Sequence, residues 1–343
     1  EFRRVLFRSD DVTWTRGRHT IKFGGGIERV RSNLDERNRP NGLWTFPSVE
    51  AMLTVQPTQY SGLIPGSDTI RGQRNSIVGA YLQDDFRVLP NLTLNLGVRY
   101  DMSTVIKEVN GKLANLRNLT DPTMTVGDPY YYNPSTKNFA PRLGFAWDPF
   151  KDGKTSIRGG AGMFDIIPLP YVLVSIFPRT TPFYKEGTLD GLGPQLSPLF
   201  PAGAFNQLSA KTLQATRFQY NPPRSYKVQW NFNIQRQLTR SVALTVGYVG
   251  SSGVKLTHTI YDHNQTPPEF AKFNGRNWTF PIPPGGNTAL IPRVNPNFAQ
   301  IRTSDFAGHS TYHSLQMNLT QRLKNRSEEH TSELQSRGLI SYA

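Results

Sequence analysis

Residues 227–238 (KVQWNFNIQRQL) alternate between apolar and polar side chains, and this period of two constrains the fold more than any other feature of the chain. Val228, Trp230, Phe232 and Ile234 share one parity, whereas amides and cations fill the other. Only an extended strand places alternate residues on opposite faces. The pattern suits a soluble sandwich, with its apolar face in a protein core, and equally a membrane barrel, with its apolar face in lipid.

The same alternation recurs in pairs of segments that are joined by tight turns. Residues 78–88 lead through a short turn into residues 92–101, and residues 141–148 lead into residues 154–165. The opening stretch turns in the same way into residues 242–250. Each pair predicts a β-hairpin with one apolar face.

The connections between these hairpins are much longer than the turns inside them. Segments of about 33–73, 105–137, 166–224 and 251–310 are rich in Pro, Gly, Asn and Tyr and show no steady period. Such loops are unusual in a compact soluble domain, but a membrane barrel has short turns at one rim and long loops at the other. We therefore expect an all-β fold: an antiparallel transmembrane β-barrel fragment, with the barrel incomplete. A soluble secreted β-sandwich that binds glycans is the alternative from another fold class.

Composition narrows the remaining function classes. The chain has no Cys, which excludes disulfide and thiolate chemistry. Its most continuous apolar run, residues 166–177, is shorter than the roughly 20 residues of a spanning helix and contains two prolines. The net charge is +14, but Lys and Arg are scattered singly, so nucleic acid is not an expected partner.

No group of residues predicts catalysis, a cofactor or a metal ion, and we expect the protein not to be an enzyme. Asp84 and Asp85 are adjacent on a strand, so their side chains point to opposite faces and cannot share a proton. Asp84 has the apolar parity and is expected at the lipid headgroups. His309 and His313 lie about 13 Å apart on a strand, which is too far for one ion.

Two sets of residues are candidates for contact with a solute. The first set has the polar parity of the strands and is predicted to line the barrel interior: Asp85, Arg99, Asp101, Arg142, Arg158, Lys227, Gln229 and Asn231. The second set lies in the long loops and suits stacking on sugars or peptides: Tyr130, Tyr131, Tyr132, Phe183, Tyr184, Asn274 and Trp278. Packing of these loop residues against one another is the alternative role.

The two ends of the chain are predicted to be artefacts. Residues 1–9 (EFRRVLFRS) and 326–334 (RSEEHTSEL) can be encoded by complementary strands of one DNA sequence, which resembles a short-read sequencing adapter. Residues 335–343 fit the continuation of such a sequence. We therefore treat 1–9 and 326–343 as adapter-like, expect them to pack poorly, and assign residues 10–325 to a partial barrel.

Several segments together resemble TonB-dependent outer-membrane receptors, in the Oar-like branch that carries a carboxypeptidase-regulatory-like amino-terminal domain. The segments are residues 17–25 (GRHTIKFGG), 81–101 (YLQDDFRVLPNLTLNLGVRYD), 138–165 (NFAPRLGFAWDPFKDGKTSIRGGAGMFD), 226–253 (YKVQWNFNIQRQLTRSVALTVGYVGSSG) and 312–323 (YHSLQMNLTQRL). The resemblance implies a barrel of about 22 strands around a plug, in the outer membrane of a Gram-negative bacterium.

The resemblance also implies the partners. These are outer-membrane lipid, a large solute such as an oligosaccharide, peptide or siderophore, and the TonB complex, which would act through an amino-terminal region missing from this chain. Neither a plug nor a TonB box is present in the sequence, and a passive outer-membrane pore or surface adhesin is the alternative on the same barrel.

Overall fold

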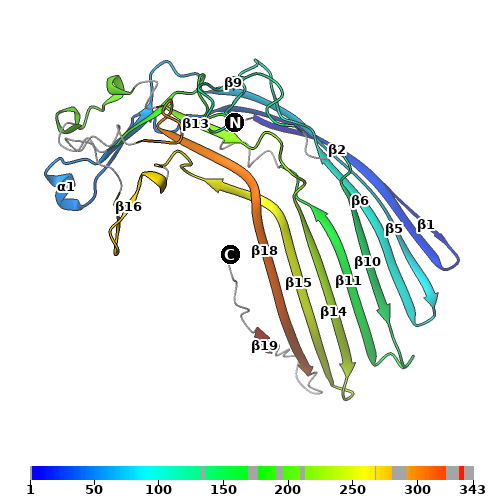
Figure 1. Cartoon of the computed structure of the whole chain (residues 1–343). Coiled ribbons are helices and arrows are strands. Elements are labelled where there is room, and N and C mark those ends of the chain that lie inside the picture. Colours follow the sequence, from blue (N-terminus) through cyan, green and yellow to red (C-terminus); the bar gives the residue numbers. More distant parts are fainter. Residues whose placement is uncertain are drawn as a thin grey trace.

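One large open sheet dominates the computed structural model, which describes residues 2–132, 136–168, 177–190, 196–208, 213–266, 268–279, 292–321 and 332–335. Its strands follow the order β1-β2-β5-β6-β10-β11-β14-β15-β18-β13 (Figure 1). Their bounds are β1 Phe2–Arg16, β2 His19–Asp35, β5 Ile70–Leu89, β6 Leu92–Ser103, β10 Phe139–Trp147, β11 Thr155–Asp165, β14 Tyr226–Gln237, β15 Val242–Ile260, β18 Gln300–Gln321 and β13 Gln214–Phe218. In the described part, β1 and β13 do not pair with each other, so the barrel is not closed.

Short turns and long connections occupy opposite rims of this sheet. The turns near Pro90, Lys151 and Thr239 lie at one rim, as the sequence predicts, together with the turn at Gly17 between β1 and β2 (Figure 1). Gly17 has a φ of 60°, a conformation that favours glycine. The long connections gather at the other rim, so the two ends of the sheet are chemically and structurally distinct.

The long connections contain small elements of their own. The first holds β3 Leu43–Thr45, α1 Val49–Leu53 and β4 Gln59–Leu63, and the second holds β7 Lys107–Glu108, β8 Ala114–Asn115 and β9 Thr125–Val126. The third holds β12 Glu186–Asp190 and the 3-10 helices η1 Ser197–Leu199 and η2 Phe205–Gln207, besides β13. The fourth holds η4 Pro268–Phe270, β16 Lys272–Phe273 and β17 Trp278–Thr279. No helix in the described residues is long and apolar enough to cross a membrane.

The pairing register separates the sheet into one apolar and one polar face. Leu94 pairs with Phe145, and Phe232 pairs with Tyr248, whereas Asn95 in the neighbouring row pairs with Gly144. Residues directly opposite each other on antiparallel strands share a face. The apolar face defined in this way includes Leu82, Leu94, Leu96, Val98, Leu143, Phe145, Trp147, Val228, Trp230, Phe232, Ile234, Tyr248, Leu315 and Met317.

In the described part of the chain, no second layer of protein covers the apolar face. Leu143 is 61% exposed, Leu315 is 56% exposed and Phe232 is 44% exposed. The three hydrophobic clusters among the described residues include none of the residues that define the apolar face. A soluble sandwich would bury this face against a second sheet, so that alternative is wrong. An exposed apolar surface that crosses so many strands instead fits contact with lipid.

The strands are tilted as in a membrane barrel. One row of paired residues runs across the sheet from His19 in β2 to Tyr248 in β15. His19 is the first residue of β2, whereas Tyr248 lies six residues after Val242, the first residue of β15. Because β15 lies six strands beyond β2, the strand ends shift by about one residue per strand. A shift of about 3.4 Å along the strand for about 4.8 Å across it gives a tilt of about 35°, within the range of transmembrane barrels.

One strand departs from the expected antiparallel arrangement. β13 pairs in parallel with β18, from Gln214↔Gln300 to Phe218↔Ser304. It comes from within the third long connection and joins the sheet at the loop rim, so its direction is not set by a hairpin. The register of β15 and β18 also shifts between Gly253 and Thr257, near the place where both strands bend in Figure 1.

The two adapter-like ends contribute backbone pairing where they are described. β1 pairs with β2 from Phe2↔Asn33 onward, and β19 Ser332–Gln335 pairs with β18. Residues 326–331 and 336–343 lie outside the described residues. Phe7 is 69% exposed. A residue on an edge strand is exposed whether its sequence is natural or derived from an adapter, so this exposure does not test the prediction. The adapter origin of both ends therefore stays a prediction.

The two faces can be tested with a matched pair of charges. In the full-length barrel, we expect Leu96→Arg to reduce folding into bilayers severely, because Arg on the lipid side costs about 2–4 kcal/mol near the midplane. Asn95→Arg should have a slight effect, since its side chain emerges on the polar face at nearly the same depth. Folding yield into vesicles, scored by gel shift, is the measurement. Equal losses would show that the faces are assigned wrongly.

Candidate functional site

The polar face of the sheet is the first candidate site. The register places all eight strand candidates on it: Asp85, Arg99, Asp101, Arg142, Arg158, Lys227, Gln229 and Asn231. Their common face follows from the alternation on each strand together with direct cross-strand pairs, such as Asp85↔Asn95 and Arg158↔Asn233. The register therefore places these residues on one face, and their role in lining a barrel interior stays a prediction.

Asp85 lies at the centre of a network that joins three strands. Lys22 of β2 places its Nζ 3.0 Å from Asp85 Oδ2. Gln83 and Asn95 donate to Asp85 Oδ1 over 3.0 and 2.6 Å. The carboxylate thus has one cation and two amide donors, which hold it at a fixed place on the polar face. Lys22 was missing from the sequence candidates, although its polar parity between Ile21 and Phe23 is readable.

A second network depends on the absence of a side chain at Gly79. Arg99 Nε and Nη2 donate to the two carboxylate oxygens of Asp101 over 2.7 and 2.9 Å. A Cβ atom at position 79 would lie 2.9 Å from Asp101 Oδ1 and 3.2 Å from Arg99 Nη2. Glycine therefore makes room for this bidentate pair to lie flat on the sheet.

A groove of about 440 Å³ lies over the polar face between these networks. Gly97 and Gly144 form its floor, and Lys22, Arg99 and Arg142 contribute cationic side chains. The Arg142 guanidinium lies 4.5 Å from the centre of the Phe164 ring, and in the described part no carboxylate reaches it within ion-pair distance. Lys22 and Arg99 are paired with Asp85 and Asp101, so Arg142 is the cation of this groove that has no carboxylate partner in the described part. Its guanidinium suits a solute that carries carboxylate, phosphate or hydroxyl groups.

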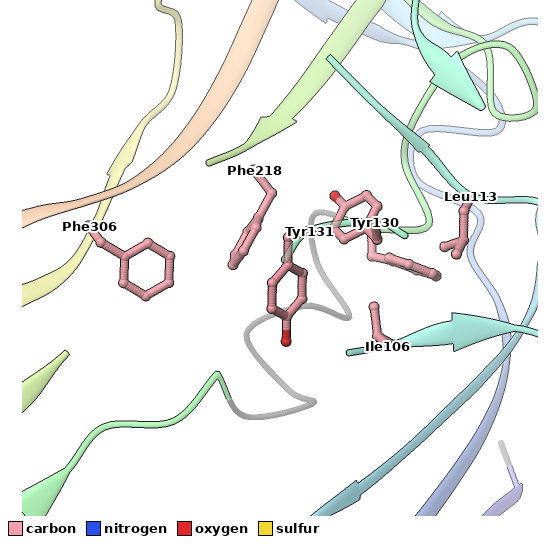
Figure 2. Close-up of a cluster of buried hydrophobic side chains, with 7 residues drawn as sticks. Ile106, Leu113, Tyr130, Tyr131, Phe218 and Phe306 are labelled. Atoms are coloured by element: carbon pink, nitrogen blue, oxygen red, sulfur yellow. The ribbon is translucent and has the colours of Figure 1, made fainter. Parts of the chain in front are cut away.

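The long loops are the second candidate site, and part of the predicted set is buried there. Tyr130 and Tyr131 are each 1% exposed and pack with Phe218 and Phe306. Figure 2 shows these rings pointing toward one another from different connections. Burial raises the pKa of the Tyr131 phenol above its usual value. Both residues therefore take the alternative role of packing inside the loops.

The remaining loop candidates divide between structural and accessible positions. Tyr184 is buried, and its hydroxyl group accepts from Asn38 N and donates to Asn38 O. Phe183 is half-buried, and its ring centre lies 5.6 Å from the Arg71 guanidinium. Asn274 Oδ1 accepts from two backbone N–H groups and so closes the β16–β17 turn.

Two exposed aromatic side chains stay available to a solute. Tyr132 is 57% exposed and lies edge-on to Tyr220, whose ring carries the Arg117 guanidinium at 4.3 Å. Trp278 is 62% exposed and packs on Phe273 at 5.1 Å between ring centres. Both present a flat surface held by a neighbouring ring, the arrangement that suits stacking on a sugar or peptide.

Buried asparagines lock three of the loops together. Asn115 donates to the carbonyl groups of Tyr130 and Phe218, and its Oδ1 accepts from Phe218 N, each over 2.9 Å. Asn295 Nδ2 donates to the carbonyl groups of Leu119 and Asp121 over 2.8 and 2.7 Å. The second, third and fourth connections therefore form one hydrogen-bonded cap. Their lack of periodicity hid these contacts from sequence reasoning.

A buried carboxyl group joins the first and third connections. Glu186 on β12 is 5% exposed; its Oε1 accepts from Asn38 Nδ2 over 2.9 Å and lies 3.7 Å from Arg39 Nη1. Burial raises its pKa above the usual value, although Arg39 and Arg179 oppose that shift. The paired strands β12 and β4 thus contain a group that binds a proton more tightly in the folded state.

This carboxyl group predicts a pH dependence of the loop unit. With a raised pKa in the folded state, its stabilising contribution is complete below about pH 4.5 and is lost as the pH rises through the folded value. Near neutral pH, we expect the amides of β12 and β4 to exchange more slowly in the Glu186→Gln variant than in the parent chain. At about pH 4, we expect the two proteins to exchange these amides at the same rate. Hydrogen exchange of these amides is the measurement. Unequal protection at about pH 4 would contradict this origin.

The asparagine locks predict a large local effect for one residue. We expect Asn115→Ala to destabilise the cap by about 1–3 kcal/mol, because the Phe218 N–H loses its partner in a buried place. Faster exchange of the Phe218 amide and faster proteolysis of the loops would report it. Asn118→Ala is the matched control, since Asn118 is exposed and, among the described residues, its side chain bonds to Asp121 alone, in its own turn. Similar effects of both variants would contradict the assignment.

Comparison with known proteins places the fold. Residues 4–332 match the family described as outer membrane beta barrel domain. Solved structures with a similar fold include a mutant of the ferric enterobactin receptor PfeA of Pseudomonas aeruginosa, at 12% identity and a TM-score of 0.49, over 98% of this chain and 36% of that chain. The outer membrane transporter YddB of Escherichia coli matches at 12% identity and 0.47, over 92% and 30%.

The siderophore receptor PirA of Acinetobacter baumannii matches at 11% identity and a TM-score of 0.46, over 97% of this chain and 36% of that chain. The chain thus spans about a third of the length of these solved structures. No curated protein matches it. With one exposed apolar face, one polar face, and a family match over residues 4–332, this chain belongs to the outer membrane beta barrel domain family.

Proposed function

We propose that this chain is part of the barrel of an outer-membrane receptor that takes up a large solute with energy supplied through the TonB complex. The observation that carries the proposal is the groove on the polar face, to which Lys22, Arg99 and Arg142 contribute their side chains. In a barrel of this family the polar face lines the interior. A solute that entered at the loop rim would therefore meet Lys22, Arg99 and Arg142 on its way through.

Burial at the loop end of the polar face favours a gated receptor over a passive pore. Arg71, Gln73 and Asn75 have the polar parity of β5, yet they are 0%, 2% and 3% exposed. The ring of Phe183, from the third connection, lies against Arg71. A passive pore keeps its interior open, so we propose that here the loops move to let the solute pass. Gating of this kind fits uptake that needs an energy source.

The solute itself is proposed by chemical class. Tyr132 and Trp278 offer stacking surfaces on the loops, and the groove offers cations and amides. Together they suit a large, partly anionic or hydroxyl-rich solute, such as an oligosaccharide, a peptide or a siderophore. The TonB complex would act through the amino-terminal region that the resemblance implies.

Uptake measurements on the full-length protein test this function. We expect a strain that lacks the gene to lose growth on a limiting solute from these classes, and the full-length gene to restore it. A proton-motive-force uncoupler, or the loss of TonB, should abolish uptake while leaving solute binding intact. Uptake that continues under both conditions would identify a passive pore instead.

Two substitutions separate binding from passage in the same assay. We expect Trp278→Ala to weaken solute binding about tenfold, the loss of one good stacking contact, since Trp278 is exposed and its removal leaves the fold intact. Arg142→Gln should slow uptake at saturating solute and leave binding at the loops unchanged. Lys151→Gln, at the tip of a turn on the opposite rim, is the control. A control variant as impaired as the other two would contradict this division.

A further inference from the structure

A row of three cations lies on the outward parity of the sheet, outside the polar face described above. Arg31 on β2 pairs directly with Arg74 on β5, and Arg74 pairs directly with Lys107 on β7. Directly opposed residues have Cβ atoms about 4.5–5.5 Å apart and share a face. Arg31, Arg74 and Lys107 are called the cation row below.

The row continues the apolar face and not the polar one. Arg31 shares its parity on β2 with Phe23 and Ile27, which are 45% and 50% exposed. Arg74 shares its parity on β5 with Leu82, which is 51% exposed. The cation row therefore points away from the proposed passage, toward the surroundings of the barrel.

Within the described residues, this charge is uncompensated. Among the described residues, no carboxylate lies within ion-pair distance of the three side chains. Arg74 donates to neutral acceptors, namely Asn33 Oδ1 and the carbonyl groups of Ser32 and Gln73. Arg31 and Lys107 are exposed. Like charges directly opposite each other destabilise a sheet, so the row needs an anion from outside the chain.

Glu108 beside Lys107 does not supply that anion. Its carboxylate accepts from the backbone N–H groups of Gly72, Asn110 and Lys112. Asp35 on β2 is also engaged, since Arg37 Nη2 lies 2.8 Å from its Oδ2. The nearby acidic residues are thus committed to the loops and the strand ends.

The depth of the row indicates what the anion is. On β2, Ile27 ends the apolar stretch, and Arg29 and Arg31 follow two and four residues later, about 7 and 14 Å along the strand toward the loop rim. This is where an outward-facing residue leaves the hydrocarbon and meets the headgroups of the leaflet on the loop side. Arg29 Nη1 is held there by a 3.0 Å hydrogen bond to Ser76 Oγ.

We propose that the cation row binds the phosphate monoester groups of an anionic lipid headgroup, whose negative charge no choline offsets, in the leaflet on the loop side. Two guanidinium groups and one ammonium group side by side match phosphate oxygens, because Arg offers two parallel donors to such an anion. Bound lipid would neutralise the repulsion within the row and hold β7, and with it the second long loop, against the barrel wall.

The test compares the full-length barrel in two bilayers: nanodiscs of phosphatidylcholine alone, and nanodiscs of phosphatidylcholine with bisphosphorylated lipid A. The measurement is the unfolding midpoint temperature. We expect lipid A to raise it by about 5 °C in the parent protein, the size typical of a ligand well above its dissociation constant. No rise in the parent protein would overturn the proposal.

The decisive variant is Arg31→Gln with Lys107→Gln, because both side chains are exposed and neither forms an ion pair within the described part of the chain. Loss of repulsion should leave its midpoint in phosphatidylcholine equal to or above that of the parent, while most of the rise with lipid A disappears. If the double variant folds poorly, Lys107→Gln alone replaces it, and about half of the rise in midpoint with lipid A should then disappear. Arg276→Gln, which removes the same charge from an exposed loop turn, should keep the full rise.

Two further outcomes would overturn the proposal. An unchanged rise with lipid A in the double variant would mean that the lipid stabilises the barrel elsewhere. An equal rise from inorganic phosphate in phosphatidylcholine nanodiscs would make the row a site for free anions and not for lipid.

Discussion

The structure depends on one constraint: every strand of the large sheet must keep its apolar residues in register with those of its neighbours. None of the described residues forms a layer over the face that these apolar residues share. A slip of one residue between two strands would turn one strand's apolar residues to the polar side. Here the rows stay matched, from Leu94 through Phe145 and Phe232 to Tyr248. Lipid is the medium in which such a face is stable, and the polar face then lies in the barrel interior.

The loops solve a different problem, because they lie in water and must fold without a continuous sheet. They do so with three small hydrophobic clusters and with asparagine side chains that replace missing backbone partners. The result is a preorganised cap whose exposed aromatics, Tyr132 and Trp278, are held by neighbouring rings. These hydrogen-bonded loops at one rim, and the groove on the polar face of the strands, link the fold to the proposed uptake function.

The sequence predicts the sheet well and the loops poorly, for a physical reason. Alternation with period two is a local property, so it reveals the hairpins, the two faces and the strand residues on the polar face. Packing within the loops is not local: Tyr130 meets Phe218 across 88 positions of sequence, without any period that announces it. The same reason hides the contact between Lys22 and Asp85, because that contact requires the register between β2 and β5 across a long connection.

The most direct test of the account is to measure whether lipid or water surrounds each face of β14. Because the chain contains no Cys, single cysteines can be introduced at successive positions from Val228 to Ile234 in the full-length barrel and labelled with a nitroxide in bilayers. The account predicts that collisions with oxygen dominate at Val228, Trp230, Phe232 and Ile234. Collisions with a water-soluble relaxation agent should dominate at Gln229, Asn231 and Asn233. A flat profile or the reverse alternation would contradict the assignment of lipid and interior to the two faces.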